Sequence, residues 1–575
     1  MSMNQTLAGL FSQMADVMEI LGHDRFRVNA FRKSARVLDS LTEDVVDIGS
    51  DVKVLSEIDG VGKGTAQRIA EFLETGIMSD HSALMDEIPK GLIELMDIPG
   101  LGPKTIALMW KQAGIKNLVD LKQKINSQEL TNLPGLGAKK IENIRKNIAF
   151  AESAGGRVRL GQAMPVACWF VAELGKLKTV KRAEYAGSVR RGKETIGDLD
   201  VIVAADEKDA AAISDVFVHL EPVTEVLMQG PTKSSVRTEG GMQVDLRVVS
   251  PKQFGTALMY FTGSKEHNIA MRQRAIDQGM RLNEYALTKG KQIVAGTTEH
   301  DVFAVLGLKW IPPALREDLG EIALAERDSL PELIEIKDIQ AELHAHTTAS
   351  DGHWSIRELA AATVERGFHT VAVTDHSKGQ AQANGLTNQR LQQHIEEVRA
   401  VANQMRRQVT ILAGSEVDIL ADGKLDYPNS LLKELDIVVA SPHAALSQDP
   451  KKATARILKA IHNPYVTIIG HPTGRLILRR EGLQPDMKQI IAAATECDVA
   501  LEINANAWRL DLRDTHARAA IDAGVKLSIN TDAHGLADLD HLIYGVLTAR
   551  RAGATKSDVV NSMSKSTLAN WLAKG

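Results

Sequence analysis

One short stretch constrains this chain more than any other, because it combines glycines, paired arginines and an Asp-x-Asp at the start of an apolar run. Residues 187–192 read Gly-Ser-Val-Arg-Arg-Gly, and residues 197–203 read Gly-Asp-Leu-Asp-Val-Ile-Val. The apolar run predicts a β-strand, in which alternate side chains share a face, so Asp198 and Asp200 are expected side by side. Neighbouring carboxylates repel each other, and a divalent cation removes that conflict.

Other residues near this pair favour the same chemistry. Asp245 lies in a second strand-like run and offers a third carboxylate. Gly187 and Ser188 are expected to form a small turn whose N–H groups and hydroxyl can hold a phosphate. Arg190 and Arg191 can pair with phosphate oxygens. This set is typical of two-metal nucleotidyl transfer, whereas the simpler alternative is a surface turn with a solvated Asp-x-Asp.

Residues 260–264 (Tyr-Phe-Thr-Gly-Ser) follow in the order that resembles the family X DNA polymerases. The resemblance implies an α+β nucleotidyltransferase palm, with Asp198, Asp200 and Asp245 as catalytic residues that bind Mg²⁺ or Mn²⁺. It implies a nucleotide site formed by Gly187, Ser188, Arg191, Gly197, Tyr260, Phe261, Gly263, Asn268 and Arg272. Tyr260 and Phe261 would lie against the deoxyribose, where a turn at 260–263 would leave no room for a 2′-hydroxyl. Lys265 departs from eukaryotic members, which often have Asp there.

The first 150 residues contain a repeat of apolar-Gly-apolar-Gly, at 58–62, 98–102 and 133–137. Helical runs follow the three copies at 63–72, 103–110 and 138–148, with Lys63, Lys104 and Lys139 close by. This helix-hairpin-helix pattern exposes N–H groups at a helix start, which suits a DNA phosphate without reading sequence. The expected DNA contacts are Gly60, Gly62, Gly100, Gly102, Lys104, Gly135 and Gly137. Packing hairpins without a ligand stay an alternative, especially for the third copy.

Two further features belong to this N-terminal region. Helical spacing of apolar residues predicts a packing helix over 5–21, and residues 25–33 also have helical character. In eukaryotic relatives the first such domain removes 5′-deoxyribose phosphate through a lysine imine. The position that corresponds to this lysine is Arg68, and a guanidinium stays protonated and cannot form the imine. We therefore expect weak or absent lyase activity.

A second set of chemical groups begins near residue 341. Apolar runs alternate with helical ones, and nearly every apolar run delivers His, Asp or Glu at its end. Residues 342–346 are expected to be a strand with both histidines on one face. In βα barrels, functional groups gather at the C-terminal ends of the strands. Mixed imidazole and carboxylate ligands suit Mn²⁺, Zn²⁺ or Fe²⁺. The residues concerned are His344, His346, Asp351, His376, Glu416, His443, His471, Asp532 and His534.

This half resembles the PHP (polymerase and histidinol phosphatase) domain, a distorted seven-stranded (β/α)7 barrel. The resemblance makes the nine residues ligands of up to three metal ions, which favour hydrolysis of phosphoesters. Arg475, four residues after His471, is a candidate phosphate contact; the alternative is a surface arginine without a functional role.

Length and composition set the remaining limits. At 575 residues, with 44% hydrophobic and 25% charged residues, the chain is expected to form roughly four globular domains. Two distant cysteines, with no apolar run of transmembrane length and no signal peptide pattern, favour a cytoplasmic protein. The net charge of −5 does not indicate DNA binding, so that prediction depends on local phosphate sites.

Together the resemblances imply a multidomain α/β protein. The expected parts are a helical 8-kDa-like DNA-binding domain (1–78), a fingers-like helical domain (79–152), a palm (153–260, entered by a connection over 151–165), a thumb (261–317), a linker (318–338) and a PHP phosphoesterase domain (339–575).

The implied function is gap-filling DNA synthesis in repair, with metal-dependent 3′–5′ exonuclease or 3′-phosphatase activity and a possible abasic-site endonuclease activity. The implied partners are gapped or nicked duplex DNA and dNTPs, bound by a monomer without a membrane. Two rival functions are a nucleotidyltransferase for RNA or a small acceptor, with an unrelated phosphatase barrel, and a non-catalytic scaffold for DNA ends. The 260–263 motif and the hairpins speak against the first rival, and the complete ligand sets against the second.

Overall fold

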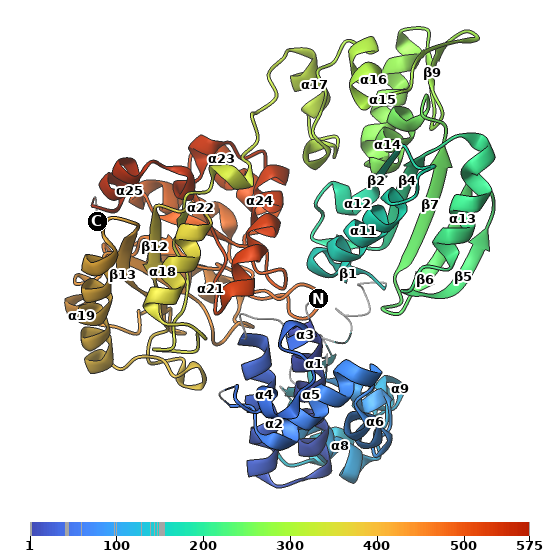
Figure 1. The fold of residues 1–575 in the computed structure, drawn as a ribbon. Helices are drawn as coiled ribbons and strands as arrows, with labels where there is room; N and C mark the ends of the chain where they lie inside the picture. Colours follow the sequence, from blue (N-terminus) through green and yellow to red (C-terminus); the bar gives the residue numbers. More distant parts are fainter. Residues whose placement is uncertain are drawn as a thin grey trace. The chain divides into compact units, whose positions relative to one another are not determined.

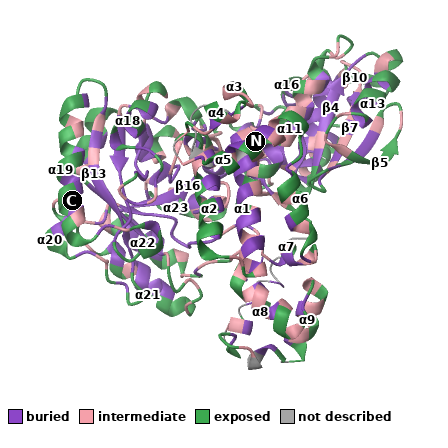
Figure 2. Cartoon of the chain, turned by 60° about the horizontal axis from the view of Figure 1, so that its bottom comes forward, coloured by how far each residue is buried: buried purple, intermediate pink, exposed green. Residues whose placement is uncertain are grey.

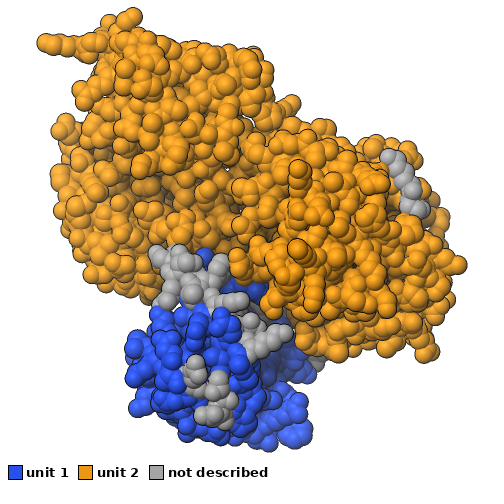
Figure 3. Space-filling model, turned by 180° about the vertical axis from the view of Figure 1, so that it is seen from behind, with its two compact units in different colours: residues 1–154, 478–480 blue, residues 155–477, 481–575 orange. Residues whose placement is uncertain are grey.

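A computed structural model describes residues 3–573 apart from 41–44, 59, 97, 99–100, 128, 139, 143, 146–147 and 149–155. The chain forms two compact units, residues 1–154 with 478–480 and residues 155–477 with 481–575 (Figure 3). Among the described residues, no helix has both the length and the apolar character needed to cross a membrane.

The first unit is helical in its described part. Its α-helices are α1 (Met3–Leu21), α2 (Arg25–Ser40), α3 (Val45–Ile48), α4 (Val52–Leu55), α5 (Lys63–Thr75), α6 (Ser79–Asp86), α7 (Gly91–Leu95), α8 (Pro103–Ala113) and α9 (Leu118–Asn126). The predicted helices at 5–21 and 25–33 are confirmed. The apolar stripe of α1, which includes Leu7, Phe11 and Val17, is fully buried in one core.

Two of the three glycine repeats end at the start of a helix, as predicted. Gly62 and Gly102 are the N-caps of α5 and α8, and neither helix start has a side-chain cap. Gly60 has φ +85°, which is the left-handed conformation that glycine adopts at low cost. Gly100, Lys139 and part of the expected helix at 138–148 lie outside the described residues.

The palm of the second unit is a five-stranded sheet of order β2-β4-β7-β6-β5. Its strands are β2 (Arg182–Tyr185), β4 (Asp198–Ala204), β5 (Val223–Gln229), β6 (Lys233–Thr238) and β7 (Gln243–Val249), and a separate pair is β1 (Val158–Arg159) with β3 (Thr195–Ile196). Its helices are α11 (Leu160–Gly175), α12 (Gly187–Arg190), α13 (Ala210–Val218) and α14 (Phe254–Thr262). Alternation in β4 separates two cores: Leu199 and Val201 pack with α11 and α13, and Ile202 packs with α14. Pro165, expected in an irregular connection, instead lies inside α11.

The thumb packs two helices on a small antiparallel sheet (Figure 1). Its elements are α15 (Lys265–Asp277), β8 (Arg281–Leu282), β9 (Leu287–Lys289), β10 (Gln292–Ala295) and α16 (Glu299–Val305). The segment expected to be a linker contains α17 (Glu321–Glu326) and contributes Ala325 and Leu333 to the thumb core.

The C-terminal part is a parallel barrel whose seven strands pair in sequence order, β11 to β17. The strands are β11 (Ala341–Glu342), β12 (Thr370–Val373), β13 (Thr410–Asp418), β14 (Ile437–Ser441), β15 (Ile468–Ile469), β16 (Ala500–Asn504) and β17 (Leu527–Asn530). A parallel bridge between Ala345 and Ala533 joins the first strand region to the last. The strands are buried, as parallel strands covered by helices should be (Figure 2).

Helices cover this barrel, and the fold class predicted from the sequence is confirmed. They are α18 (Ile356–Glu365), α19 (Asn388–Met405), α20 (Asn429–Leu432), α21 (Pro450–Ile461), α22 (Met487–Cys497), α23 (Asp514–Asp522), α24 (Leu542–Arg551) and α25 (Lys565–Leu572). One strand differs from its prediction. β11 ends at Glu342, so His344 and His346 follow the strand instead of forming part of it.

Candidate active sites

Two parallel strands bring the palm carboxylates together. Strands β4 and β7 pair so that Asp200 lies directly beside Asp245, and Asp198 lies two residues earlier on the same face as Asp200. Gly187 lies against Asp200, since a Cβ at this glycine would be 2.8 Å from the Asp200 Oδ2 atom. The sheet register, which the sequence could not supply, thus unites residues 45 positions apart.

The electrostatics of these carboxylates favour a cation. Burial and the charges of Asp198 and Asp245 together raise the pKa of Asp200 to about 7, although Arg247 and Arg191 act in the opposite direction. An all-oxygen donor set of this kind fits Mg²⁺ or Mn²⁺, which would relieve the repulsion.

Most of the predicted nucleotide residues lie on α12 and α14 or directly after them. Ser188 lies within the short helix α12, where a turn was expected, and Arg191 directly follows that helix. Tyr260 and Phe261 lie within α14, also not in a turn, and their rings meet edge to face at 5.3 Å. Gly263 ends α14 with φ +68°; a Cβ there would lie 3.1 Å from Nη1 of Arg191.

The two adjacent arginines have different partners. Arg190 makes a bidentate pair with Glu299, at 2.8 and 2.9 Å, and also donates to Thr262 Oγ1 at 2.7 Å. Burial favours the neutral acid at Glu299, but Arg316 and Arg190 hold its pKa well below the usual range. Arg190 therefore pairs with a buried carboxylate and not, as the sequence suggested, with phosphate oxygens.

The remaining palm residues lie on the thumb side or beside Asp198. Asn268 and Arg272 are both on α15; Asn268 Nδ2 donates to the Tyr260 carbonyl at 2.6 Å, and Arg272 Nε donates to the Asn268 carbonyl at 3.3 Å. Gly197 directly precedes β4. The bond from Asn268 links α15 to the helix that carries the two aromatic residues.

The barrel gathers the predicted metal ligands into three groups of closely spaced donor atoms. The groups are His346, Asp351, His376 and His534; His344, His346, Glu416 and Asp532; and His376, Glu416 and His443. Each pair of groups shares one residue. His471, the ninth predicted residue, is outside these groups, but its Nε2 lies 2.9 Å from Glu416 Oε1. All nine side chains therefore converge at one end of the barrel.

Contacts inside this cluster fit metal ligands better than a hydrogen-bonded core. Nδ1 of His376 and Oε2 of Glu416 lie 2.8 Å apart, yet neither buried atom has a hydrogen-bond partner among the described residues. His344 Nε2 and His346 Nδ1 are also buried and receive or donate no hydrogen bond within the described part of the chain. Burial and the nearby His534 and His376 lower the pKa of His346 to about 4, which keeps this ring neutral. Nearby carboxylates outweigh burial and raise the pKa of His344, His443 and His534, so a cation would compete with protons for these rings. Imidazole and carboxylate ligands together suit Mn²⁺, Zn²⁺ or Fe²⁺.

Carboxylates behind the cluster orient its histidines. Glu502 Oε1 lies 2.7 Å from His344 Nδ1, and Asp418 bonds to His443 Nδ1. Glu502 also accepts the His471 backbone N–H at 2.7 Å. Such partners fix the ring orientation so that the other nitrogen faces a metal. Neither residue was predicted from the sequence; Glu502 lies within β16, and Asp418 is the last residue of β13.

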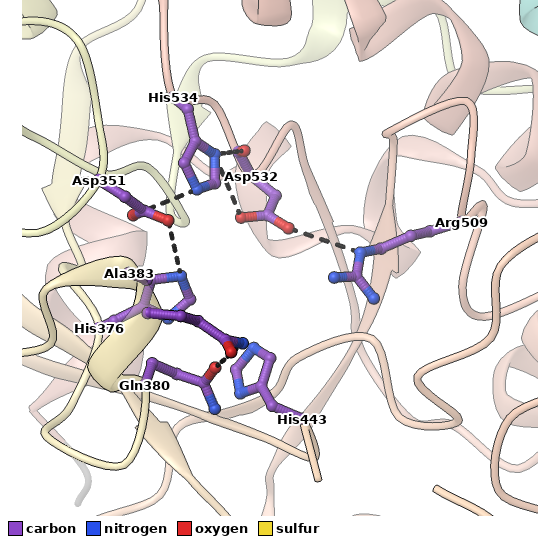
Figure 4. A pocket seen from close by; sticks show the side chains of 9 residues that line it. Asp351, His376, Gln380, Ala383, His443, Arg509, Asp532 and His534 are labelled. Atoms are coloured by element: carbon purple, nitrogen blue, oxygen red, sulfur yellow. Dashed lines mark hydrogen bonds and ion pairs between the residues drawn. The ribbon is translucent and has the colours of Figure 1, made fainter. Parts of the chain in front are cut away.

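A cavity of about 280 Å³ opens over the cluster. Figure 4 shows Asp351 between His534 and His376, and Arg509 on the far side of Asp532. Arg509 Nε lies 3.8 Å from Asp532 Oδ2, and its side chain is 20% exposed. Gln380 and Gln382 line the other wall. Arg509 therefore offers positive charge at the opening of the cluster.

Arg475, which the sequence marked as a phosphate contact, points elsewhere. It is buried and donates to Glu194 Oε2 of the palm at 2.7 Å and to the Leu510 carbonyl. The buried ion pair with Glu194 holds this arginine in place, although its Nε has no hydrogen-bond partner among the described residues. Arg475 thus joins the barrel to the palm, and Arg509, on the loop after β16, lies where the phosphate contact was expected.

The described hairpin residues of the first unit are exposed, apart from Gly60, which is half-buried. The Lys104 side chain is 82% exposed, and its Nζ lies 3.8 Å from Glu19 Oε1. Gly135 and Gly137 belong to the third copy of the glycine repeat. Arg68 donates to Asp80 Oδ2 at 2.8 Å and to the Gly64 carbonyl at 2.7 Å.

Comparisons with known proteins agree with this architecture. A model of the DNA polymerase beta thumb matches residues 257–317, and a model of the PHP domain matches residues 342–506. A helix-hairpin-helix domain matches residues 2–78, and a SAM-like helix-hairpin-helix tandem matches residues 92–148. The fold thus joins the parts of a family X polymerase to a PHP barrel.

Individual relatives match nearly the whole chain or only one part of it. The DNA polymerase/3'-5' exonuclease PolX of Bacillus subtilis is 39% identical over 559 residues, which are 96% of each protein. DNA polymerase lambda of Rattus norvegicus is 29% identical over 51% of this chain and 53% of its own length. A probable phosphatase of Thermoanaerobacter sp. is 30% identical over 38% of this chain and 89% of its own length. This chain belongs to the PolX family, the family X DNA polymerases that carry a PHP domain.

Proposed function

We propose that this chain is a DNA-directed DNA polymerase that fills short gaps during repair, and that its barrel hydrolyses 3′ ends as a 3′–5′ exonuclease or 3′-phosphatase. The observation that carries the proposal is the presence of two separate ligand sets in one chain, which is 39% identical over 96% of its length to the Bacillus subtilis protein. An abasic-site endonuclease activity is a further candidate for the same barrel, because it is also phosphoester hydrolysis.

In the palm, Asp198, Asp200 and Asp245 would hold Mg²⁺ or Mn²⁺, and Arg191 with Ser188 would bind the triphosphate. Gly187, Gly197 and Gly263 would let the backbone approach the phosphates and sugar. Tyr260 and Phe261 would lie against the deoxyribose, while Asn268 and Arg272 would face the new base pair. Bound cations at both sites supply positive charge that offsets negative charge on the reacting phosphate.

In the barrel, nine residues would hold up to three cations, for which Mn²⁺, Zn²⁺ and Fe²⁺ are the candidates. These residues are His344, His346, Asp351, His376, Glu416, His443, His471, Asp532 and His534. Arg509 would bind a non-bridging oxygen of the terminal phosphate and so orient the ester for in-line attack. The cavity above the cluster would admit one strand end, since its walls are formed by polar side chains on several loops.

The DNA partner is proposed to be gapped or nicked duplex bound by a monomer in the cytoplasm. Uncapped helix starts at Gly62 and Gly102 support phosphate contacts on the 5′ side of a gap. Gly60, Gly100, Lys104, Gly135 and Gly137 would complete these contacts. The free cysteines Cys168 and Cys497 fit a reducing compartment. For the domains we propose the same boundaries that the sequence predicts.

Gap filling by the full-length protein tests the polymerase assignment. We expect one dNTP to be added to a one-nucleotide gap with Mg²⁺ or Mn²⁺, and dATP to be preferred over ATP opposite thymine. Preference for the ribonucleotide would favour a nucleotidyltransferase for RNA, and inactivity with both metals would favour a scaffold for DNA ends.

Metal analysis of the same protein, together with a 3′-end hydrolysis assay, tests the barrel assignment. We expect more bound metal than the palm can account for, and hydrolysis that a chelator abolishes. A full-length protein that binds no transition metal and leaves 3′ ends intact would contradict the assignment.

A further inference from the structure

The barrel contributes one side chain to the surroundings of the palm nucleotide site. Arg551, the last residue of α24, has a side chain that is only 4% exposed. Its Nη1 donates to Glu317 Oε1 at 2.8 Å and to the Arg191 carbonyl at 3.0 Å. Its Nε and Nη2 both lie 2.8 Å from Asp514 Oδ2, on α23 of the same barrel. Asp514 thus anchors this guanidinium in the barrel while its other end holds two groups of the polymerase half.

Glu317 is shared between this barrel arginine and the proposed triphosphate ligand. Arg191 Nε donates to the same Oε1 atom at 3.0 Å, and Arg191 Nη1 donates to the Thr262 carbonyl. No described residue accepts a hydrogen bond from Arg191 Nη2. Burial alone would raise the pKa of Glu317, but Arg551 and Arg191 hold it below the usual value, so the carboxylate stays ionised. Two nitrogens of Arg191 are therefore fixed, and the third is available for phosphate oxygens.

Apolar contacts also hold α24 against the palm, next to the loop that carries Arg191. Ile543, Tyr544 and Leu547 of α24 pack on the palm core. Gly192, the next residue after Arg191, allows this approach, because a Cβ there would lie 3.3 Å from the Leu547 Cβ. The position of the loop, and not only its charge, thus depends on α24.

We propose that Arg551 is a positioning residue for polymerisation: it shares Glu317 with Arg191 and thereby aims Arg191 at the incoming triphosphate. This inference rests on the proposed role of Arg191 in nucleotide binding. Without Arg551, Glu317 would keep as counter-ions Arg191 and Lys193, whose Nζ is 3.8 Å away. The carboxylate would then neutralise Arg191 more completely and draw its fork away from the phosphates. The barrel would in this way set the affinity of the polymerase for dNTPs.

The test measures gap filling and 3′-end hydrolysis by full-length Arg551→Ala. We expect the KM for dNTP to rise about tenfold while kcat changes by less than about twofold. We also expect hydrolysis to stay at the wild-type rate, because the described contacts of Arg551 do not include the metal cluster. Arg551→Lys, which keeps the charge but loses the fork, is expected to give an intermediate KM.

A second variant separates positioning from mere attachment of the two halves. In the Arg551→Ala background, Glu317→Gln removes the charge that captures Arg191, so it is expected to lower the KM again. A parallel loss of both activities with a lower Tm, or an unchanged KM in Arg551→Ala, would overturn the inference. If Arg191→Ala itself leaves the KM for dNTP unchanged, the proposed role of Arg191 is what fails.

Discussion

His376 and Glu416 face each other at 2.8 Å, Nδ1 to Oε2, in a geometry that makes no hydrogen bond. Two buried groups that could bond but do not are typical of ligands turned toward a common cation. The same carboxylate contacts His443 at 3.2 Å and His471 at 2.9 Å, so Glu416 lies at the centre of the barrel site. We expect that site and the palm to act separately.

Loss of a palm ligand should abolish synthesis alone. We expect Asp198→Ala to lower gap filling more than about a thousandfold, because the cation loses an oxygen ligand. Hydrolysis of 3′ ends by the same preparation should stay unchanged. Asp215→Ala, on the exposed side of α13, is the matched control. If Asp198→Ala removed both activities, the two-site interpretation would be wrong.

Loss of a barrel ligand should have the reverse effect. We expect His344→Ala to lower 3′-end hydrolysis more than about a hundredfold and to reduce the bound metal, with gap filling retained. His462→Ala, an exposed histidine at the end of α21, serves as the control. Normal metal content in His344→Ala would show that this residue is no ligand.

The raised pKa of Asp200 predicts how stability depends on pH when metal is removed. Its folded-state pKa of about 7 exceeds the ordinary 3.8, so the folded protein holds this proton more tightly than the unfolded one. The chelated protein should therefore lose stability, by at most about 4 kcal/mol, as the pH rises from about 4 to about 7. Mg²⁺ should restore the loss above pH 7.

Thermal unfolding of Asp200→Asn in a chelator checks this reasoning. Because the amide carries no charge, the variant should be more stable than the wild type at pH 8 and equal to it near pH 4. Gap filling should be lost in the same variant. A lower unfolding temperature than the wild type at pH 8 would show that repulsion among the carboxylates is not the cause.

Removal of the positive charge beside the barrel cluster should weaken substrate binding. We expect Arg509→Ala to raise the KM for 3′-end hydrolysis about ten- to hundredfold, since a charge-assisted contact to the phosphate is lost. Arg407→Ala, an exposed arginine after α19, should have no effect. Arg475→Ala should instead lower the Tm, because it leaves Glu194 without its partner. A KM effect in Arg475→Ala but not in Arg509→Ala would reverse the two assignments.

Borohydride trapping on an abasic 5′ end tests the absence of lyase chemistry. Arg68 is bound to Asp80 and to the Gly64 carbonyl, and a guanidinium forms no imine, so no adduct is expected. Arg68→Lys should allow an adduct, because its amine can lose a proton and attack the sugar aldehyde. A trapped adduct on residues 1–75 of the wild-type protein would contradict this prediction.

The sequence by itself determined the features that depend on local order. The spacing of Asp198 and Asp200 fixed their shared face, because a strand alternates with a period of two. Glycine repeats fixed the helix starts at Gly62 and Gly102, and apolar runs ending in His or Asp fixed the barrel class.

Tertiary structure decided which of several similar side chains meets which partner. The register of β4 against β7 placed Asp245 beside Asp200, and no local pattern encodes a register between distant strands. Arg190 and Arg191 are adjacent, yet a buried Glu299 takes the first and Glu317 the second. Arg475, the phosphate contact expected from the sequence, is instead paired with Glu194, and Arg509, for which the sequence predicted no role, lies beside the metal cluster. A long charged side chain is placed by the nearest buried counter-charge, and that is a property of the folded chain.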